Sequence, residues 1–475
     1  MYKNKFAGLI ILLIGLFGTY QGTAQTLQMA ALEDTKLIND YQLIGQVGKQ
    51  TLIYKKSNTK TEIQAFDDSL DILWTKPIEL QTNRSTRLLA IIPHAQTFQL
   101  LYSYYQKGNT EIHVQTFSAA AEFVSDTLVY QFKSFFDDSQ VIFSKNQRYF
   151  VWYKRMSGQQ QVFCYDLQTE QIIWQQLLPK TEPKSFKYMD KLTVSNDGTA
   201  YLLEQHIQRN TSGDNLPHFS LYTLYSNTDL PTQRLDFGYR YYDFVLQYDE
   251  WNGRLVIAGF YGVGKYSNKF NQIDGLFSFR QGLDAQVVYT PVAEFEDPNT
   301  KKDKKMLVEN FEPTDILLRR DGGILLLAEQ RYIYNSNAAF DEGIGSGRSK
   351  DYIYKSILAA SVAPNGVSEW QKILHKEQVS SDDNGRYSSY FLFRGRSEIR
   401  VVFNDNVHWE SGILEYLITG KGEINRNVIP HHKKRHKAIM ELRHSLQISA
   451  NTFLTLSRAT GYGNTELYLS RMTYE

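Results

Sequence analysis

Two Glu-Gln pairs are the first residues in the chain whose type and position suggest chemistry. Glu204-Gln205 and Glu329-Gln330 each end a strand-like run that follows an Asp-Gly turn. A carboxylate at the rim of a central channel could bind a cation or a sugar hydroxyl group. The alternative is that these side chains satisfy buried polar groups of the fold. The residue types favour that structural role, and Glu329 is kept as a candidate binding residue.

Other reactive residue types form no catalytic or metal-binding pattern. His432 and His436 have the i, i+4 spacing of metal ligands on a helix, but Lys and Arg lie between them and would repel a cation. The glycine-rich stretch at 340–348 lacks the Gly-Lys-Ser/Thr of a phosphate loop. Cys164 lies within a strand-like run, where we expect it to be packed rather than reactive. We therefore expect no catalytic residue, no metal and no cofactor.

The elements that would position these residues repeat along the chain. Short strand-like runs separated by turn residues form a unit of four strands, and no long amphipathic helical pattern interrupts them. The units begin near residues 41, 87, 140, 188, 242, 314, 389 and 438. A fixed period of four strands is typical of β-propeller blades. The sequence predicts an all-β chain folded as a single eight-bladed β-propeller with four-stranded antiparallel blades, with seven blades as the alternative.

Two local signatures recur within the unit. Tight turns such as Asn196-Asp197-Gly198 and Asp321-Gly322-Gly323 separate the first strand from the second. Tryptophans recur on the fourth strand, as at Trp74, Trp174 and Trp370. We expect each indole to wedge between neighbouring blades.

The last unit is one strand short. It offers strands at 438–446, 451–458 and 465–474, and the printed sequence then stops. Residues 26–36 precede the first full unit and include the strand-compatible run Leu-Gln-Met-Ala-Ala-Leu. We therefore expect the N-terminal strand to close the last blade, which would cover an exposed sheet edge.

The N-terminus has the features of a secretory signal peptide. A basic start precedes an apolar run from Phe6 to Gly18 and a small-residue cleavage site that ends at Ala24. We expect cleavage there, a propeller domain over residues 25–475, and export to the periplasm or the outer surface. The run is too short to span a bilayer, and we expect no membrane insertion. A formal net charge of +1 gives no electrostatic case for a nucleic-acid partner.

The long insertions in the pattern fall on one face. In a propeller, the connections between second and third strands and between blades emerge on the same side. The long insertions, at 209–216, 262–272, 294–310, 335–350 and 377–388, all belong to this set. Loops on a rigid scaffold commonly carry function, although insertions at the surface are also simply tolerated. The candidate contacts on this face are Tyr266, Arg348, Tyr387 and Trp409.

Two resemblances accompany these patterns. The run from Cys164 to Trp174 resembles repeats of pyrroloquinoline-quinone-type propellers, which have eight blades; their vicinal disulfide is impossible with one cysteine. Residues of the 255–405 region resemble an uncharacterised family of exported Bacteroidota proteins, through the stretches 259–261, 273–277, 370–373, 387–390 and 403–406. The second resemblance implies export and no particular activity.

Two functions remain open at this point. The favoured one is a non-enzymatic binding or scaffold protein of the bacterial envelope, engaging a protein or an envelope glycan through the long-loop face. The alternative is a propeller enzyme with its site in the central channel, either acting on glycans or resembling a quinoprotein oxidoreductase. Carboxylates or histidines converging at the channel mouth would favour the enzyme.

Overall fold

The computed structural model describes most of the chain from Gln25 onward. The described residues are 25–33, 35, 38–80, 86–133, 139–156, 159–178, 191–209, 215–226, 231–236, 239–263, 272–282, 287–295, 308–337, 348–407, 412–429, 438–460 and 465–474. The proposed signal peptide, residues 1–24, lies outside them and stays a prediction. Within the described residues no helix has the length and apolar character needed to span a membrane.

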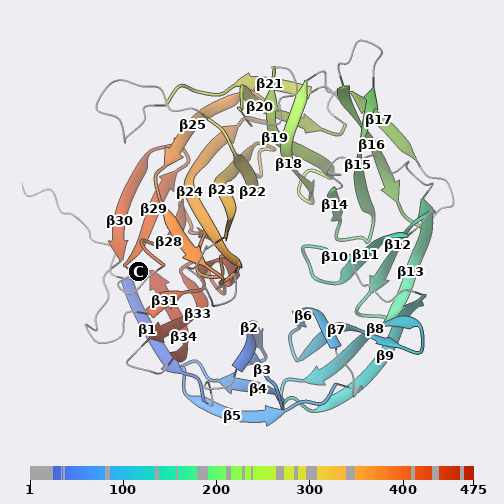
Figure 1. The fold of residues 1–475 in the computed structure, drawn as a ribbon, viewed down its shortest axis with the longest axis vertical. Helices are drawn as coiled ribbons and strands as arrows, with labels where there is room; N and C mark the ends of the chain where they lie inside the picture. Colours follow the sequence, from blue (N-terminus) through green and yellow to red (C-terminus); the bar gives the residue numbers. More distant parts are fainter. Residues whose placement is uncertain are drawn as a thin grey trace, which may run out of the picture.

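Eight antiparallel sheets stand in a ring, so the predicted eight-bladed propeller is confirmed (Figure 1). Each blade runs from an innermost strand near the channel to an outermost strand at the rim. Blade 1 comprises β2 (Ile38–Val47), β3 (Gln50–Ser57), β4 (Thr61–Phe66) and β5 (Ile72–Pro77). Blade 2 comprises β6 (Thr86–Pro93), β7 (Thr97–Gln106), β8 (Asn109–Ser118) and β9 (Phe123–Phe132). Blade 3 comprises β10 (Gln140–Phe143), β11 (Tyr149–Met156), β12 (Gln159–Asp166) and β13 (Gln171–Leu178). Blade 4 comprises β14 (Lys191–Val194), β15 (Ala200–Arg209), β16 (Asn215–Leu224) and β17 (Thr232–Asp236). Blade 5 comprises β18 (Arg240–Asp249), β19 (Arg254–Gly262), β20 (Gly275–Arg280) and β21 (Val287–Pro291).

Blades 6 to 8 carry the departures from this simple pattern. Blade 6 has β22 (Phe311–Leu318), β23 (Ile324–Asn337), β24 (Arg348–Val362) and β25 (Ser368–Leu374), with β26 (Gln378–Ser381) added to β24. Blade 7 has β27 (Phe391–Arg394), β28 (Glu398–Asn404), β29 (Ile413–Thr419) and β30 (Ile424–Ile429). Blade 8 has β31 (Ala438–Met440), the short 3-10 helix η2 (Leu442–His444), β32 (Leu446–Gln447), β33 (Thr452–Thr460), β34 (Thr465–Tyr474) and β1 (Gln25–Ala31).

The apolar core lies between the blades. The described residues form eight hydrophobic clusters, each drawn from two successive blades, so that one cluster fills each junction of the ring. At the junction of blades 8 and 1, Tyr41 and Leu43 pack with Leu454 and Leu456. Burial of apolar area of this kind is the main favourable term in folding. The ring is therefore closed by the same packing that joins every other pair of blades.

The N-terminal strand closes the last blade, as the sequence predicts. β1 pairs antiparallel with β34 from Gln25 opposite Tyr474 to Ala31 opposite Tyr468. It occupies the outermost position of blade 8 (Figure 1). The innermost position differs from the expected continuous strand at 438–446, because η2 interrupts it between β31 and β32.

Two of the recurring tryptophans form hydrogen bonds to the next blade. Trp174 Nε1 of blade 3 donates to the Gly198 carbonyl of blade 4 at 2.9 Å. Trp370 Nε1 of blade 6 donates to the Gly420 carbonyl of blade 7 at 3.3 Å. Gly198 has φ of +88°, a backbone conformation that glycine adopts without steric cost. The indoles therefore lie between blades in both cases.

The first turns of blades 3 to 6 also bind one another. The backbone N–H of Asn146 donates to Asn196 Oδ1 at 2.9 Å, and the N–H of Asn196 donates to Glu250 Oε1 at 2.6 Å. Arg254 then donates to the Gly322 carbonyl at 3.1 Å. These turns connect first to second strands, so they lie on the face opposite the long loops. That face is thus tied together by short turns.

The long-loop face contains more regular structure than the sequence predicts. The stretch 377–388 was expected to be a loop, but it begins with β26, which pairs with β24 from Tyr354 opposite Gln378 to Asp351 opposite Ser381. β23 and β24 likewise extend their hairpin to Asn337 opposite Arg348, shortening the loop expected at 335–350. Blade 6 therefore projects a three-stranded extension at the long-loop end of the ring.

Candidate functional site

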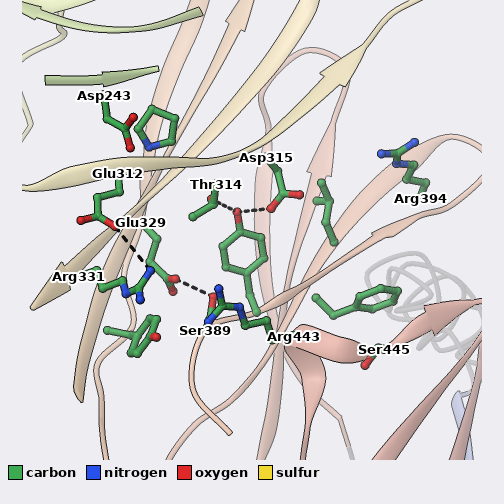
Figure 2. Close-up of a pocket in the computed structure, with 15 residues that line it drawn as sticks. Asp243, Glu312, Thr314, Asp315, Glu329, Arg331, Ser389, Arg394, Arg443 and Ser445 are labelled. Carbon is green, nitrogen blue, oxygen red and sulfur yellow. Dashed lines mark hydrogen bonds and ion pairs between the residues drawn. The ribbon is translucent and has the colours of Figure 1, made fainter. Parts of the chain in front are cut away.

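A pocket of about 550 Å³ lies where the innermost strands of blades 5 to 8 meet the long-loop face. It is built from the starts of β22 and β27, from β18, from the facing strands β23 and β24, and from the segment around η2. Its volume falls in the usual range of small-molecule sites. The pocket is lined by Asp243, Glu312, Pro313, Thr314, Asp315, Glu329, Arg331, Tyr354, Ser389, Tyr390, Phe391, Leu392, Arg394, Arg443 and Ser445 (Figure 2).

Glu329 lies in the wall of this pocket and has internal partners. Its carboxylate forms an ion pair with Lys376, with 2.6 Å between Oε1 and Nζ, and both side chains are about 1% exposed. The Ser389 hydroxyl donates to Glu329 Oε2 at 2.6 Å (Figure 2). Lys376 Nζ also donates to Gln378 Oε1 at 2.8 Å. The Glu329 charge is therefore balanced within the protein.

The other three carboxylates of the lining also have protein partners. Asp243 pairs with Lys191, with 3.0 Å between the closest atoms. Glu312 lies 3.6 Å from an Arg331 nitrogen. The remaining carboxylate, that of Asp315, accepts a hydrogen bond of 2.7 Å from the hydroxyl of Tyr390. None of the four carboxylates is thus left without a partner.

Burial changes the proton affinity of the Asp315–Tyr390 pair. Burial raises the pKa of Asp315, while the Tyr390 hydrogen bond and the charges of Arg394 and Arg443 oppose that shift. Burial also raises the pKa of Tyr390 well above its usual value, and the neighbouring carboxylates add to the increase. A phenol with a raised pKa stays protonated at neutral pH, so Tyr390 is poorly suited to act as a base.

The arginines are the groups with unused binding capacity. Among the described residues, neither the Arg394 nor the Arg443 guanidinium makes a hydrogen bond or ion pair, and both side chains are exposed. In Arg331, Nε is buried and has no hydrogen-bond partner among the same residues. Figure 2 shows Arg331 and Arg443 in the region of Glu329 and Ser389, and Arg394 beyond Asp315. Three of the carboxylates are balanced in ion pairs, and Arg394 and Arg443 both act electrostatically on the fourth, that of Asp315, so the pocket keeps an excess of positive charge and favours an anionic group.

The five predicted contact residues do not lie together in the structure. Glu329 lines the pocket, whereas Tyr387 is buried and its hydroxyl contacts that of Tyr41 at 2.9 Å. Arg348 begins β24, and only its backbone position is described. Tyr266 and Trp409 lie outside the described residues. The structure thus brings one of the five candidates, Glu329, to the pocket.

The other residues singled out in the sequence lie elsewhere. Glu204 is buried in blade 4 and accepts a hydrogen bond of 2.6 Å from Gln160, which is consistent with a structural role. Cys164 is fully buried, and burial raises the pKa of its thiol. The segment with His432 and His436 lies outside the described residues. Within the described part of the chain, no group of three or more His, Cys, Asp or Glu side chains is arranged to hold a metal ion.

Sequence reasoning missed most of the lining. Arg331 follows Glu329 by two residues on the same strand, a spacing that could have pointed to a shared face. Asp315 and Tyr390 stand near the starts of two predicted blades, which places them at the long-loop end. Arg443 carries no comparable signal, because it reaches the pocket only through the interruption of the inner strand by η2.

The comparisons with known proteins concern the fold alone. No family model matches the chain, and no curated protein matches it. Among solved structures, the WD40 domain of SCAP from fission yeast is similar at 10% identity, covering 95% of this chain and 98% of that one, with a TM-score of 0.40. An oligogalacturonate lyase in complex with manganese is similar at 10% identity, covering 95% and 98%, with a TM-score of 0.37. TolB from Acinetobacter baumannii is similar at 12% identity, covering 86% and 80%, with a TM-score of 0.28.

Proposed function

We propose that this propeller is a non-enzymatic binding protein of the bacterial envelope that holds an acidic glycan in the pocket at its long-loop face. The observation that carries the proposal is the charge pattern of the lining. The four carboxylates have internal partners, whereas Arg394 and Arg443 make no ion pair among the described residues. Guanidinium groups pair strongly with carboxylates, so the ligand should bring its own carboxylate.

The rest of the lining favours a sugar acid over an acidic peptide. A sugar acid presents hydroxyl groups beside its carboxylate, and the Ser445 hydroxyl lines the same pocket and has no hydrogen-bond partner among the described residues. Phe391, which is half-buried, adds aromatic surface against which the apolar face of a sugar ring can pack.

Four carboxylates converge on the pocket, as the enzyme hypothesis requires, but three of them are held in ion pairs, so binding fits this site better than catalysis. General acid–base chemistry needs a group that exchanges its proton near neutral pH. Burial raises the pKa of Tyr390, and Glu329 is tied to Lys376 at 2.6 Å. Asp315, whose pKa burial also raises, is the carboxyl group that a general acid would require. The glycan-active enzyme is therefore the alternative, and incubation of the ligand with the protein distinguishes the two.

The test compares two tetramers that differ only in their carboxylates. Calorimetric titration with a β-1,4-linked mannuronic acid tetramer should show binding, and the matched mannose tetramer should bind at least about tenfold more weakly. Arg443→Glu should weaken mannuronate binding by about 10- to 100-fold, because hydrogen bonds to charged groups contribute about 1.5–3 kcal/mol. Arg396→Glu is the matched control, because Arg396 is exposed in the same region and does not line the pocket.

Three results would refute the proposed ligand binding. Equal affinity for the acidic and neutral tetramers would remove the role of the arginines. Shortening of the mannuronate chains during incubation, detected by chromatography, would show the enzyme instead. Tight binding of a tetraglutamate peptide in place of the sugar would assign the site to acidic peptides. A separate measurement tests the envelope location. The mass of the exported protein should equal that of a chain that begins at Gln25, and an uncleaved N-terminus would contradict the location.

A further inference from the structure

A second pocket lies beside the first at the same end of the channel. It has a volume of about 380 Å³ and lies between blade 8 and blade 1. The innermost strand of blade 1, the connection between β26 and β27, η2 and β33 supply its walls. It is lined by Asp40, Tyr41, Gln42, Leu43, Asp383, Asn384, Arg386, Glu441, Arg443, His444 and Leu456.

The segment from Asp382 to Ser389, here named the strap, contributes to both pockets. Asp383 and Asn384 line the second pocket, and Ser389 lines the first. The strap crosses from blade 6 toward blade 1, where Arg386 donates to the Tyr41 carbonyl at 2.9 Å. The two pockets are therefore adjacent compartments on either side of one segment.

The strap is held in a fixed and unusual conformation. Arg386 forms an ion pair of 3.0 Å with Glu441 and stacks over the Tyr41 ring at 3.8 Å. Asp382, Asn384 and Ser389 all have positive φ, at 55°, 57° and 75°. Such conformations cost free energy in non-glycine residues and are concentrated at ligand-binding and active sites. The surrounding contacts thus keep the strap between the pockets.

Arg443 connects the two compartments. It lines both pockets, its side chain is exposed, and among the described residues its guanidinium makes no ion pair or hydrogen bond. Around it the second pocket presents the carboxylates of Asp40 and Asp383 and the amide of Gln42, while Glu441 is paired with Arg386. These groups can accept hydrogen bonds from sugar hydroxyl groups, and the carboxylate of a second sugar unit must face away from them. A ligand carboxylate at Arg443 would therefore have polar pockets on both sides.

We propose that the second pocket is a further subsite for the same ligand, so that the site takes an acidic oligosaccharide of at least two sugar units with a carboxylate at Arg443. This inference rests on the proposed function, and it adds the length of the ligand and its path. One sugar unit lies in the first pocket, and the chain continues past Arg443 into the second. A single sugar acid fills only one compartment.

The first experiment uses the unaltered protein and a series of chain lengths. Mannuronic acid, its dimer and its tetramer are titrated by calorimetry under the same salt conditions. We expect affinity to rise by about tenfold or more from monomer to dimer or tetramer, because the second unit binds without a second loss of translational freedom. Equal affinity for the monomer and the tetramer would overturn the second subsite while leaving the proposed function in place.

The second experiment blocks the second pocket with a larger side chain. Gln42 is exposed and lines that pocket alone, so Gln42→Trp should leave monomer binding unchanged and reduce tetramer affinity to about the monomer level. Gln140→Trp is the matched control, because Gln140 is also exposed on an innermost strand and lines neither pocket. The control variant should retain the full dependence on chain length.

The outcomes separate the two proposals. If no mannuronate of any length binds the unaltered protein, the proposed function fails, and the subsite fails with it. If the monomer binds but Gln42→Trp leaves tetramer affinity intact, the subsite alone is refuted. If Gln42→Trp does not fold, the chain-length series on the unaltered protein still decides the question.

Discussion

The buried pair of Lys376 and Glu329 gives the sharpest test of how this pocket is built. Replacing Lys376 by Met removes the ammonium group and leaves the Glu329 carboxylate uncompensated behind the pocket wall. The two side chains are about 1% exposed and their charged atoms lie 2.6 Å apart. Removal of one partner from a pair this deeply buried costs about 3–5 kcal/mol. We therefore expect Lys376→Met to lower the free energy of unfolding by that amount.

The assay is urea denaturation followed by tryptophan fluorescence, with a control on the same blade. Lys372 lies four residues earlier on β25 with an exposed side chain, so Lys372→Met should change the free energy of unfolding by less than about 0.5 kcal/mol. The double variant Lys376→Met with Glu329→Gln removes both charges. It should be more stable than Lys376→Met alone, because no unpaired charge remains buried.

Burial and pairing act in opposite directions on Lys376. Burial lowers the pKa of its ammonium group, and the Glu329 carboxylate opposes that shift. A loss below about 1 kcal/mol for Lys376→Met would show that the pair contributes as little as a surface ion pair. A double variant no more stable than Lys376→Met would show that lost packing, and not the stranded charge, causes the effect. Either result would refute the reasoning.

Three further predictions concern the ring away from the pocket. Burial alone lowers the pKa of His113, but the hydrogen bonds and charges of Asp126 and Glu111 outweigh it and raise the pKa overall. The stability that this contributes is present below about pH 6.5, the pKa of an unfolded histidine, and is lost as pH rises through the raised value. The difference in unfolding free energy between wild type and His113→Gln should therefore fall as pH rises above about 6.5. Cys164 should resist alkylation in the folded protein and react after denaturation, measured by mass, because burial raises the pKa of its thiol. Deletion of residues 25–31 should lower the free energy of unfolding by at least about 3 kcal/mol in urea denaturation, because the ladder with β34 is lost; an unchanged midpoint would contradict ring closure by this strand.

The repeat could be predicted because its signals are local. Turns such as Asn196-Asp197-Gly198 need a residue with positive φ at a fixed place, and Gly198 has φ of +88°. Trp174 marks the fourth strand and reaches the next blade through Gly198. The missing strand of the last unit also predicted correctly that β1 pairs with β34. Each of these inferences needed only neighbouring residues or a count of units.

The candidate site could not be predicted in the same way. Its lining comes from four blades and extends in sequence from Asp243 to Ser445. Glu329 was recognised as a polar candidate, but it lies within β23 and not at the end of a strand as expected. Its partner Lys376 gave no signal, because the two meet only when β26 and the strap fold back on blade 6. Tyr387 was expected to contact a ligand, whereas the structure gives it Tyr41 as an internal partner. Contacts between residues this distant in sequence depend on how the blades are arranged in space.

The sequence by itself determined that the chain forms repeated four-stranded sheets and which end supplies the closing strand, and it favoured eight sheets over seven; the structure decided the number. Those properties follow from the alternation of side chains along strands and from turn chemistry, both of which act over a few residues. The tertiary structure alone decided which charges are balanced and which are left for a ligand. Whether Glu329 or Arg443 has a partner depends on the packing of separate blades around the channel, and no local pattern records that packing.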